Sequence, residues 1–165
     1  METIYLEKTT ELKRAKAELE KKLNVKIKIQ DKEAIVEGES LDEYEAMQVI
    51  EAISFGFSAG KALLLKEPEY AFRKLHIKEF AGKRKLTVIK SRLIGRQGKT
   101  KKTIENISDS YIIIQESEIG IISPSESIEF VITALINLMK GTKQSNVYKY
   151  LEKINKTRRE EEVLL

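Results

Sequence analysis

Apolar and polar residues follow two different periods along the first third of the chain, and these periods predict its secondary structure. Apolar residues recur every three or four positions between residues 12 and 23, which is the spacing of a helix that buries one face. From 25 to 29 apolar and polar residues alternate, as they do along a half-buried strand. Asp31-Lys32 predicts a turn into a second strand at 34–36, so that the two strands form a hairpin. A longer helix follows, and Gly56 stands where that helix is expected to end.

The same pattern returns, without a gap, 85 residues later in the chain. Identical residues at this offset include Lys16 and Lys101, Glu20 and Glu105, Ser40 and Ser125, and Gly56 and Gly141. A register that preserves both identities and apolar periodicity indicates an internal repeat. The second copy is predicted to contain a strand at 86–89, a short helix at 91–94, a helix at 99–107, strands at 111–115 and 119–122, and a helix at 125–139. A last helix is predicted around residues 147–151.

The repeat predicts two domains of the α+β class. We expect residues 1–79 to hold the first copy together with a linker helix. Residues 80–165 are expected to hold the second copy and a C-terminal helix. Between the copies, a short helix at 61–66 is predicted to stop before Pro68, because proline cannot continue a helix. The segment 70–82 is then expected to lead into the second copy.

Composition excludes several classes of site. The chain has 165 residues and no cysteine, so it can form neither disulfides nor thiolate metal sites. His76 is the only histidine, which excludes zinc sites built on a histidine pair, and it has no partner nucleophile. No apolar run approaches the ~20 residues that span a bilayer, and the N-terminus lacks the pattern of a secretory signal. We therefore expect a cytoplasmic protein that is not an enzyme, holds no cofactor or metal and does not contact membranes.

Positive charge is concentrated in the second half of the chain. The formal net charge is +4, yet residues 80–165 alone hold 16 basic and 10 acidic side chains. Between Phe80 and Ile104 there are nine basic residues and no acidic one. Such a tract attracts polyanions, because each lysine or arginine that neutralises a phosphate releases a condensed counterion. The alternative is the solvated surface of a lysine-rich protein, and charge alone does not decide between the two.

The basic tract contains the segment Gly95-Arg96-Gln97-Gly98-Lys99-Thr100. A nucleotide-binding P-loop that ends in Gly-Lys-Thr would require a glycine at position 93, where the chain has Leu93, so this interpretation is disfavoured. The competing interpretation is a G-x-x-G loop between two helices. Its two glycines lack Cβ atoms, which lets a sugar–phosphate backbone approach the main chain at a helix N-terminus.

With its flanking elements, this loop resembles that of type I KH domains, whose element order is β-α-α-β-β-α. The resemblance covers the whole second copy and implies that about four nucleotides of single-stranded RNA are clamped at the loop. Bases would lie over an apolar groove, for which Ile104 and alternate residues of the strand 112–114 are further candidates, although a place in the core is the alternative for each isoleucine. The RNA-binding residues that the resemblance implies are Gly95, Arg96, Gln97, Gly98, Lys99, Lys102, Ile94 and Arg92.

The first copy departs from this pattern at the loop. At the 85-residue offset the two glycines fall on Thr10 and Lys13, and Glu11 lies between them. A carboxylate at this place would repel a phosphate, and no glycine opens the main chain to it. We therefore expect a degenerate KH domain that keeps the fold and either packs against the second copy or binds protein.

A degenerate KH domain followed by a complete one is similar to the archaeal Krr/Partner-of-Nob family of two-KH-domain proteins. The similarity spans nearly the whole chain and includes Gly56-Phe57-Ser58, Gly141-Thr142 and Val147-Tyr148-Lys149-Tyr150-Leu151, whereas Gln144 stands where a histidine is expected. It implies a factor of small-subunit ribosome assembly that binds ribosomal RNA near its 3′ end during rRNA processing. The Nob endonuclease is the protein partner that it implies. The alternative function is a protein-binding scaffold of an RNA-processing complex, in which the KH folds are structural.

Overall fold

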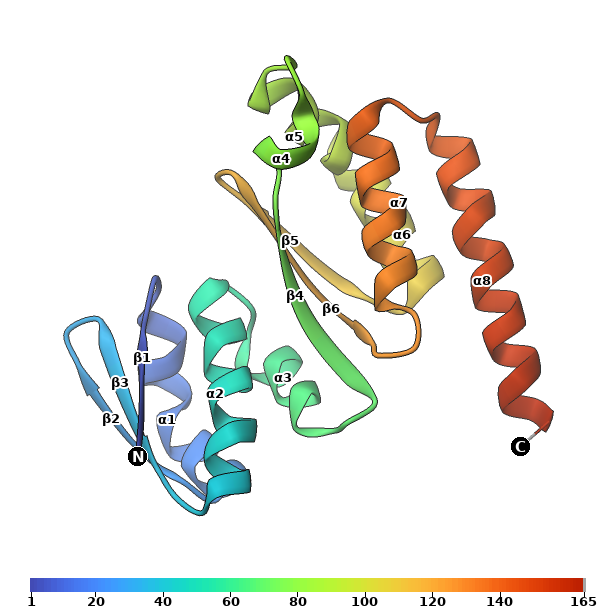
Figure 1. Ribbon diagram of the computed structural model, residues 1–165. Coiled ribbons are helices and arrows are strands. Elements are labelled where there is room, and N and C mark those ends of the chain that lie inside the picture. Colours follow the sequence, from blue (N-terminus) through green and yellow to red (C-terminus); the bar gives the residue numbers. More distant parts are fainter. Residues whose placement is uncertain (165) are drawn as a thin grey trace. The chain divides into compact units, whose positions relative to one another are not determined.

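The computed structural model describes residues 1–164, which form two compact units joined between Phe72 and Arg73 (Figure 1). Each unit combines a three-stranded sheet with helices, so the expected α+β class is confirmed. Within these residues, none of the helices is both long enough and apolar enough to span a bilayer.

The first unit consists of a strand, a hairpin and helices that pack on the sheet. Its elements are β1 (Glu2–Tyr5), α1 (Thr10–Leu23), β2 (Lys26–Gln30), β3 (Glu33–Glu37), α2 (Ser40–Phe55), α3 (Ala59–Ala62) and the 3₁₀ segment η1 (Leu63–Lys66). The sheet order is β1-β3-β2, and both pairings are antiparallel. Ile27 and Val36 lie opposite each other and are buried, as is Leu19 of α1, so the predicted helix and hairpin are confirmed.

The second unit repeats this plan with additional helices. Its first strand is β4 (Tyr70–His76), which begins before the division and continues into the second unit. The elements that follow are α4 (Lys78–Ala81), α5 (Leu86–Ile94), the 3₁₀ turn η2 (Arg96–Gly98), α6 (Lys99–Ser108), β5 (Tyr111–Gln115), β6 (Glu118–Pro124), α7 (Ile128–Lys140) and α8 (Gln144–Leu164). The sheet order is β4-β6-β5, the counterpart of β1-β3-β2. Helices α6 and α7 pack on the sheet, and α8 packs against both of them (Figure 1). Ile121 of β6 and Leu135 of α7 are buried in the core between these layers.

The strand predicted at 86–89 is wrong, because these residues form the start of α5. Ile89 and Leu93 are buried four positions apart, whereas the neighbouring Val88 is 50% exposed, which is a helical pattern. In so short an apolar segment the sequence pattern does not distinguish a helix from a strand. The first strand of this unit is β4, which lies in the segment predicted to connect the two copies.

The division between the units lies earlier than the predicted boundary between residues 79 and 80. The physical reason is that β4 pairs with β6 and thereby completes the sheet of the second unit. The first unit also differs from the predicted order β-α-α-β-β-α. Only residues 6–9 connect β1 to α1, so no helix precedes α1 at this place.

The 85-residue repeat is present in the backbone as well as in the sequence. The hairpins of the two units turn at residues with nearly the same positive φ, 51° at Asp31 and 50° at Glu116. Helices α1 and α6 each end at a left-handed residue, with φ of 54° at Asn24 and 52° at Asp109. Asparagine and aspartate are the non-glycine residues that adopt this conformation most readily. The two copies therefore share one framework, although most of their residues differ.

The identical glutamates at this offset make the same hydrogen bond. A carboxylate oxygen of Glu20 in α1 accepts a bond from the N–H of Ile27 at 3.0 Å. The equivalent oxygen of Glu105 in α6 accepts one from the N–H of Ile112 at 2.9 Å. Each carboxylate thus ties a helix to the strand that follows it, which gives a physical reason for the identity.

Replacing Glu105 by alanine is expected to lower the free energy of unfolding of the second unit by about 1–2 kcal/mol, because the N–H of Ile112 would lose its partner. Glu105→Gln is the matched control, since the amide oxygen can still accept this bond. Urea denaturation of both variants measures the difference. Equal stabilities of the alanine and glutamine variants would contradict this role of the carboxylate.

Candidate nucleic-acid interface

The loop from Gly95 to Gly98 joins α5 to α6 through a left-handed turn. The backbone angle φ is 76° at Gly95, 54° at Gln97 and 74° at Gly98. The N–H of Gly95 donates to the carbonyl of Ser91 at 2.9 Å, and the N–H of Gly98 donates to the carbonyl of Gly95 at 3.2 Å. Positive φ is unfavourable for most L residues and is readily adopted by glycine. The turn therefore explains why glycines stand at these two places.

The surroundings of the two glycines differ. A Cβ atom on Gly95 would lie 2.1 Å from Oγ1 and 2.7 Å from the backbone nitrogen of Thr100, so a side chain there would displace the start of α6. A Cβ atom on Gly98 would meet no atom within 4 Å. Gly95 is therefore required by packing inside the protein, whereas Gly98 leaves the main chain open to a ligand.

Three predicted phosphate ligands, Arg96, Lys99 and Lys102, are exposed in the loop and the first turn of α6, as is Gln97. Within residues 1–164, none of these three basic side chains forms an ion pair. Lys101, by contrast, lies 3.1 Å from the carboxylate of Glu105. The charge of the three exposed side chains is therefore available to an anion.

Arg92, also predicted to bind RNA, makes hydrogen bonds inside the protein. Its Nε donates to the carbonyl of Leu138 at 3.1 Å, and its Nη2 donates to the carbonyl of Thr142 at 3.0 Å. Arg84 likewise donates to the carbonyl of Met139 at 2.6 Å. These bonds satisfy carbonyls at the C-terminal end of α7, where the helix dipole also favours positive charge. Arg92 therefore links α5 to the end of α7, and its contact with RNA stays a prediction.

The predicted groove residues divide between core and surface. Ile104 is fully buried and Ile112 is 2% exposed, so both belong to the core, which was the alternative for them. Ile113 and Ile114 of β5 are partly exposed. Ile94, the last residue of α5, is also partly exposed and directly precedes the loop. It is therefore the predicted groove residue that lies beside Gly95.

One polar contact at the loop has no signal in the sequence. Gln144, the first residue of α8, donates from Nε2 to Oγ1 of Thr100 at 3.0 Å. The two residues are 44 positions apart, and no motif or periodicity connects them. Only the packing of α8 against α6 brings them together.

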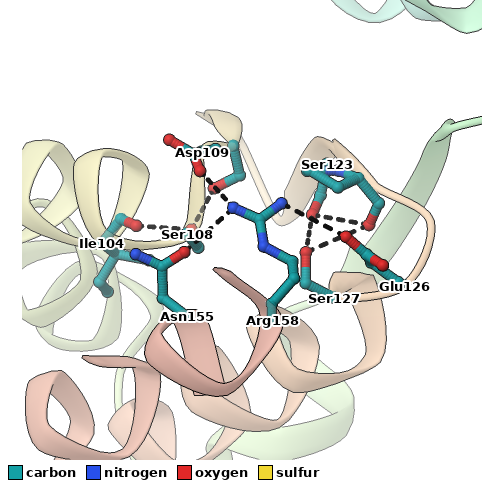
Figure 2. A network of polar contacts seen from close by, with 10 residues as sticks. Ile104, Ser108, Asp109, Ser123, Glu126, Ser127, Asn155 and Arg158 are labelled. Atoms are coloured by element: carbon teal, nitrogen blue, oxygen red, sulfur yellow. Dashed lines mark hydrogen bonds and ion pairs between the residues drawn. The ribbon is translucent and has the colours of Figure 1, made fainter. Parts of the chain in front are cut away.

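Arg158 anchors α8 near the opposite end of α6 (Figure 2). Its guanidinium binds the carboxylate of Asp109 and donates to Oδ1 of Asn155 at 3.0 Å, and it lies 3.7 Å from the carboxylate of Glu126. Beside this network lie the buried hydroxyls of Ser108, Ser110, Ser123 and Ser127. Helix α8 therefore contacts the region of α6 from Thr100 at its start to Asp109 at its end.

In the first unit, the residues that correspond to the loop form the first turn of α1. Residues 10–13 are helical, and none of them has a positive φ. Glu11 accepts hydrogen bonds from Nε of Arg14 at 2.6 Å and from the N–H of Ala59 at 2.8 Å. These two bonds lower the pKa of Glu11 from 4.5 to about 2, and the bond from Arg14 has the larger effect. This place therefore holds a carboxylate that is ionised at neutral pH.

The part of the chain that the structure describes contains no group of three or more histidine, cysteine, aspartate and glutamate side chains arranged to hold a metal ion. The imidazole of His76 is 60% exposed, and its Nδ1 lies 4.0 Å from the carboxylate of Glu118 on the neighbouring strand β6.

Residues 71–156 match the family model of the second KH domain of PNO1, which is described as a eukaryotic-type, or type I, KH domain. The match begins in β4 and ends in α8, so it contains the whole loop. It also begins before residue 80, in agreement with the pairing of β4 in the sheet of the second unit.

Two curated proteins are similar to much of this chain. A KH domain-containing protein of Methanocaldococcus jannaschii is 28% identical over 145 residues, which are 84% of this chain and 64% of that protein. The RNA-binding protein pno1 of Ixodes scapularis is 32% identical over 108 residues, which are 63% of this chain and 46% of that protein. The chain thus spans less than two thirds of the length of the curated relatives that it matches.

A solved structure shares the fold over nearly the whole chain. It is aDim2p of Pyrococcus horikoshii, crystallised in a complex with a/eIF2α and rRNA, and it superposes with a TM-score of 0.83 at 26% sequence identity. The superposition covers 94% of each chain. Together with the family match over more than half of the sequence, this similarity shows that the chain belongs to the Pno1/Dim2-like family of KH-domain proteins.

Proposed function

We propose that this chain binds single-stranded RNA at the Gly95–Gly98 loop, as a factor in ribosome assembly. The observation that carries the proposal is the open main chain at Gly98, where a left-handed backbone leaves room for a phosphate directly before the N-terminus of α6. KH domains clamp about four nucleotides at such a loop. The relatives support this function, because the Ixodes pno1 protein is named as RNA-binding and the Pyrococcus aDim2p structure includes rRNA.

The target that we propose is small-subunit ribosomal RNA near its 3′ end, bound during rRNA processing. The rRNA in the complex of the Pyrococcus relative supports ribosomal RNA as the class of ligand. The 3′ region follows from the resemblance to the Krr/Partner-of-Nob family.

Different groups supply affinity and selectivity in this proposal. Arg96, Lys99 and Lys102 neutralise phosphates, a contribution that does not depend on RNA sequence. Bases lie over the apolar surface that begins at Ile94, and their edges and stacking provide the sequence preference. The phosphate that approaches Gly98 fixes how the RNA is aligned with the basic side chains and with the apolar surface.

We propose that the first unit is a degenerate KH domain that does not grip RNA. Its sheet order and its left-handed positions at Asn24 and Asp31 match those of the second unit, which supports a common fold. It has no glycine loop before α1, and Glu11 places a negative charge there. Packing against the second copy and contact with protein are the roles that this leaves for it, and the Nob endonuclease stays a predicted partner.

Gly98→Asp is expected to weaken binding to a single-stranded fragment of small-subunit rRNA at least tenfold, about 1.4 kcal/mol, because its carboxylate would occupy the approach of the phosphate. Gly60→Asp is the control for the added charge, since Gly60 is exposed and no atom lies within 4 Å of its Cβ position. Fluorescence-anisotropy titration compares the two variants. Equal affinities would remove the loop from the mechanism, and no binding by the unchanged protein at low salt would favour the scaffold function.

Alanine at Arg96, Lys99 or Lys102 should weaken binding to all RNA sequences alike. Each change should also reduce the slope of log K against log salt by about 0.7, the expectation for one single-strand phosphate. Lys101→Ala removes the same charge from a lysine paired with Glu105 and should change the slope less. Titrations of two RNA sequences at several salt concentrations test this. If Arg96→Ala alters the preference at one nucleotide and leaves the slope intact, Arg96 reads a base instead.

The double variant Glu11→Gln, Lys13→Ala should keep RNA affinity and its salt slope within about twofold of the unchanged protein, because no phosphate contact is lost. Glutamine retains an oxygen that can accept the bond from Ala59, so the first unit stays folded. The same titrations and a thermal melt measure both effects. A loss of affinity as large as that of Gly98→Asp would show that the first unit also grips RNA.

A further inference from the structure

We propose that Gln144 is a positioning residue that holds the Gly95–Gly98 loop in the conformation that binds RNA. The proposal rests on the proposed RNA-binding function of the loop. It assigns to α8, which follows the β-α-α-β-β-α order of the KH domain, a direct part in shaping the binding site.

The first step of the argument is the contact between Thr100 and Gly95. Thr100 is 3% exposed, and its Oγ1 lies 2.1 Å from where a Cβ atom of Gly95 would be. The backbone nitrogen of Thr100 lies 2.7 Å from the same point. The threonine hydroxyl therefore fills the space that a side chain on the first residue of the loop would need, so Thr100 is packed directly against Gly95.

The second step is the hydrogen bond that orients this threonine. Nε2 of Gln144 donates to Oγ1 of Thr100 at 3.0 Å, and within residues 1–164 the structure shows no other hydrogen bond to this hydroxyl. A buried hydroxyl that loses its partner is unfavourable and rotates or moves to find another. Loss of the Gln144 amide would therefore loosen Thr100 and, through it, Gly95.

The third step is that Gln144 is itself held in place. Val147 and Leu151, on the same helix, are buried, and Arg158 is bound to Asp109 at the end of α6 (Figure 2). Because α8 contacts both the start and the end of α6, its first residue is fixed by the packing of the whole helix. Gln144 is itself exposed, but its amide reaches the buried hydroxyl of Thr100 from a backbone position that the packing of α8 holds in place.

The repeat provides independent support for this role. At the 85-residue offset Gln144 corresponds to Ala59, the first residue of α3. The N–H of Ala59 donates to Glu11 in the first turn of α1. In both units, the helix that follows the long helix after the hairpin contacts the N-terminal turn of an earlier helix: α3 contacts α1, and α8 contacts α6. In the second unit this contact supports an open loop, whereas in the first unit the contacted group is the carboxylate of Glu11.

The test compares Gln144→Ala, Thr100→Val, the double variant and the control Asn146→Ala, which changes an exposed residue in the same turn of α8. Affinity for the single-stranded rRNA fragment is measured at two salt concentrations, together with the melting temperature. The amide ¹H–¹⁵N resonances of Gly95 and Gly98 are recorded in the protein without RNA. Gly98→Asp is included as the control for the RNA-binding function itself.

Gln144→Ala and Thr100→Val are each expected to weaken RNA binding about threefold to tenfold, because the loop must then be ordered on binding. The double variant should lose no more affinity than the single variant with the larger loss, since both changes remove the same interaction. The salt slope should stay unchanged, because no phosphate contact is removed. The Gly95 and Gly98 resonances should shift in both single variants and stay in place in Asn146→Ala.

Two results would overturn this inference and leave the proposed RNA-binding function intact. One is wild-type affinity in Gln144→Ala while Gly98→Asp no longer binds. The other is a double variant whose loss is the product of the two single losses. Wild-type affinity in Gly98→Asp would instead overturn the proposed function and, with it, this inference.

Discussion

A hydrogen bond that a strand N–H donates to a helix carboxylate joins helix and sheet in both units. Glu20 and Glu105 each accept a bond from the N–H of an isoleucine near the start of the following strand. Between helix and strand the chain passes through one left-handed residue, Asn24 or Asp109, and reverses at once. The bond fixes where the strand begins relative to the helix, and the alternation of apolar residues along the strand decides which of them face the core. The hairpin and the helix that covers it then follow from the same register.

The two units differ mainly in the segment that leads into the loop helix. In the first unit residues 6–9 connect β1 directly to α1, whereas in the second unit α4, α5 and the loop intervene. This additional segment contains Gly82, Gly95, Gln97 and Gly98, whose positive φ values have no counterpart in the first unit. The shared framework supplies a helix with a free N-terminal turn, and the added segment supplies a main chain that a phosphate can approach.

The basic residues of the second unit serve two different purposes. Arg84 and Arg92 satisfy carbonyls at the end of α7, and Arg158 joins α8 to the residue after α6. Arginine suits these places because its planar group can donate to several oxygens at once. Lys99 and Lys102, by contrast, are exposed at the start of α6. The positive tract in the sequence therefore combines structural arginines with side chains that are free to meet an anion.

The sequence by itself determined the repeat, the hairpins, most helices and the G-x-x-G loop, because each depends on local periodicity or on a backbone that only glycine adopts easily. It did not distinguish α5 from a strand or identify β4, since pairing with β6 decides which segment joins the sheet. Arg92 was predicted at the RNA site because charge is visible in sequence, and this stays a prediction; its carbonyl partners, 46 and 50 residues away, are known only from the structure. The support of Thr100 by Gln144 likewise exists only once α8 packs on α6. Contacts between residues far apart in the chain are set by the packing of complete elements, and no local pattern encodes them.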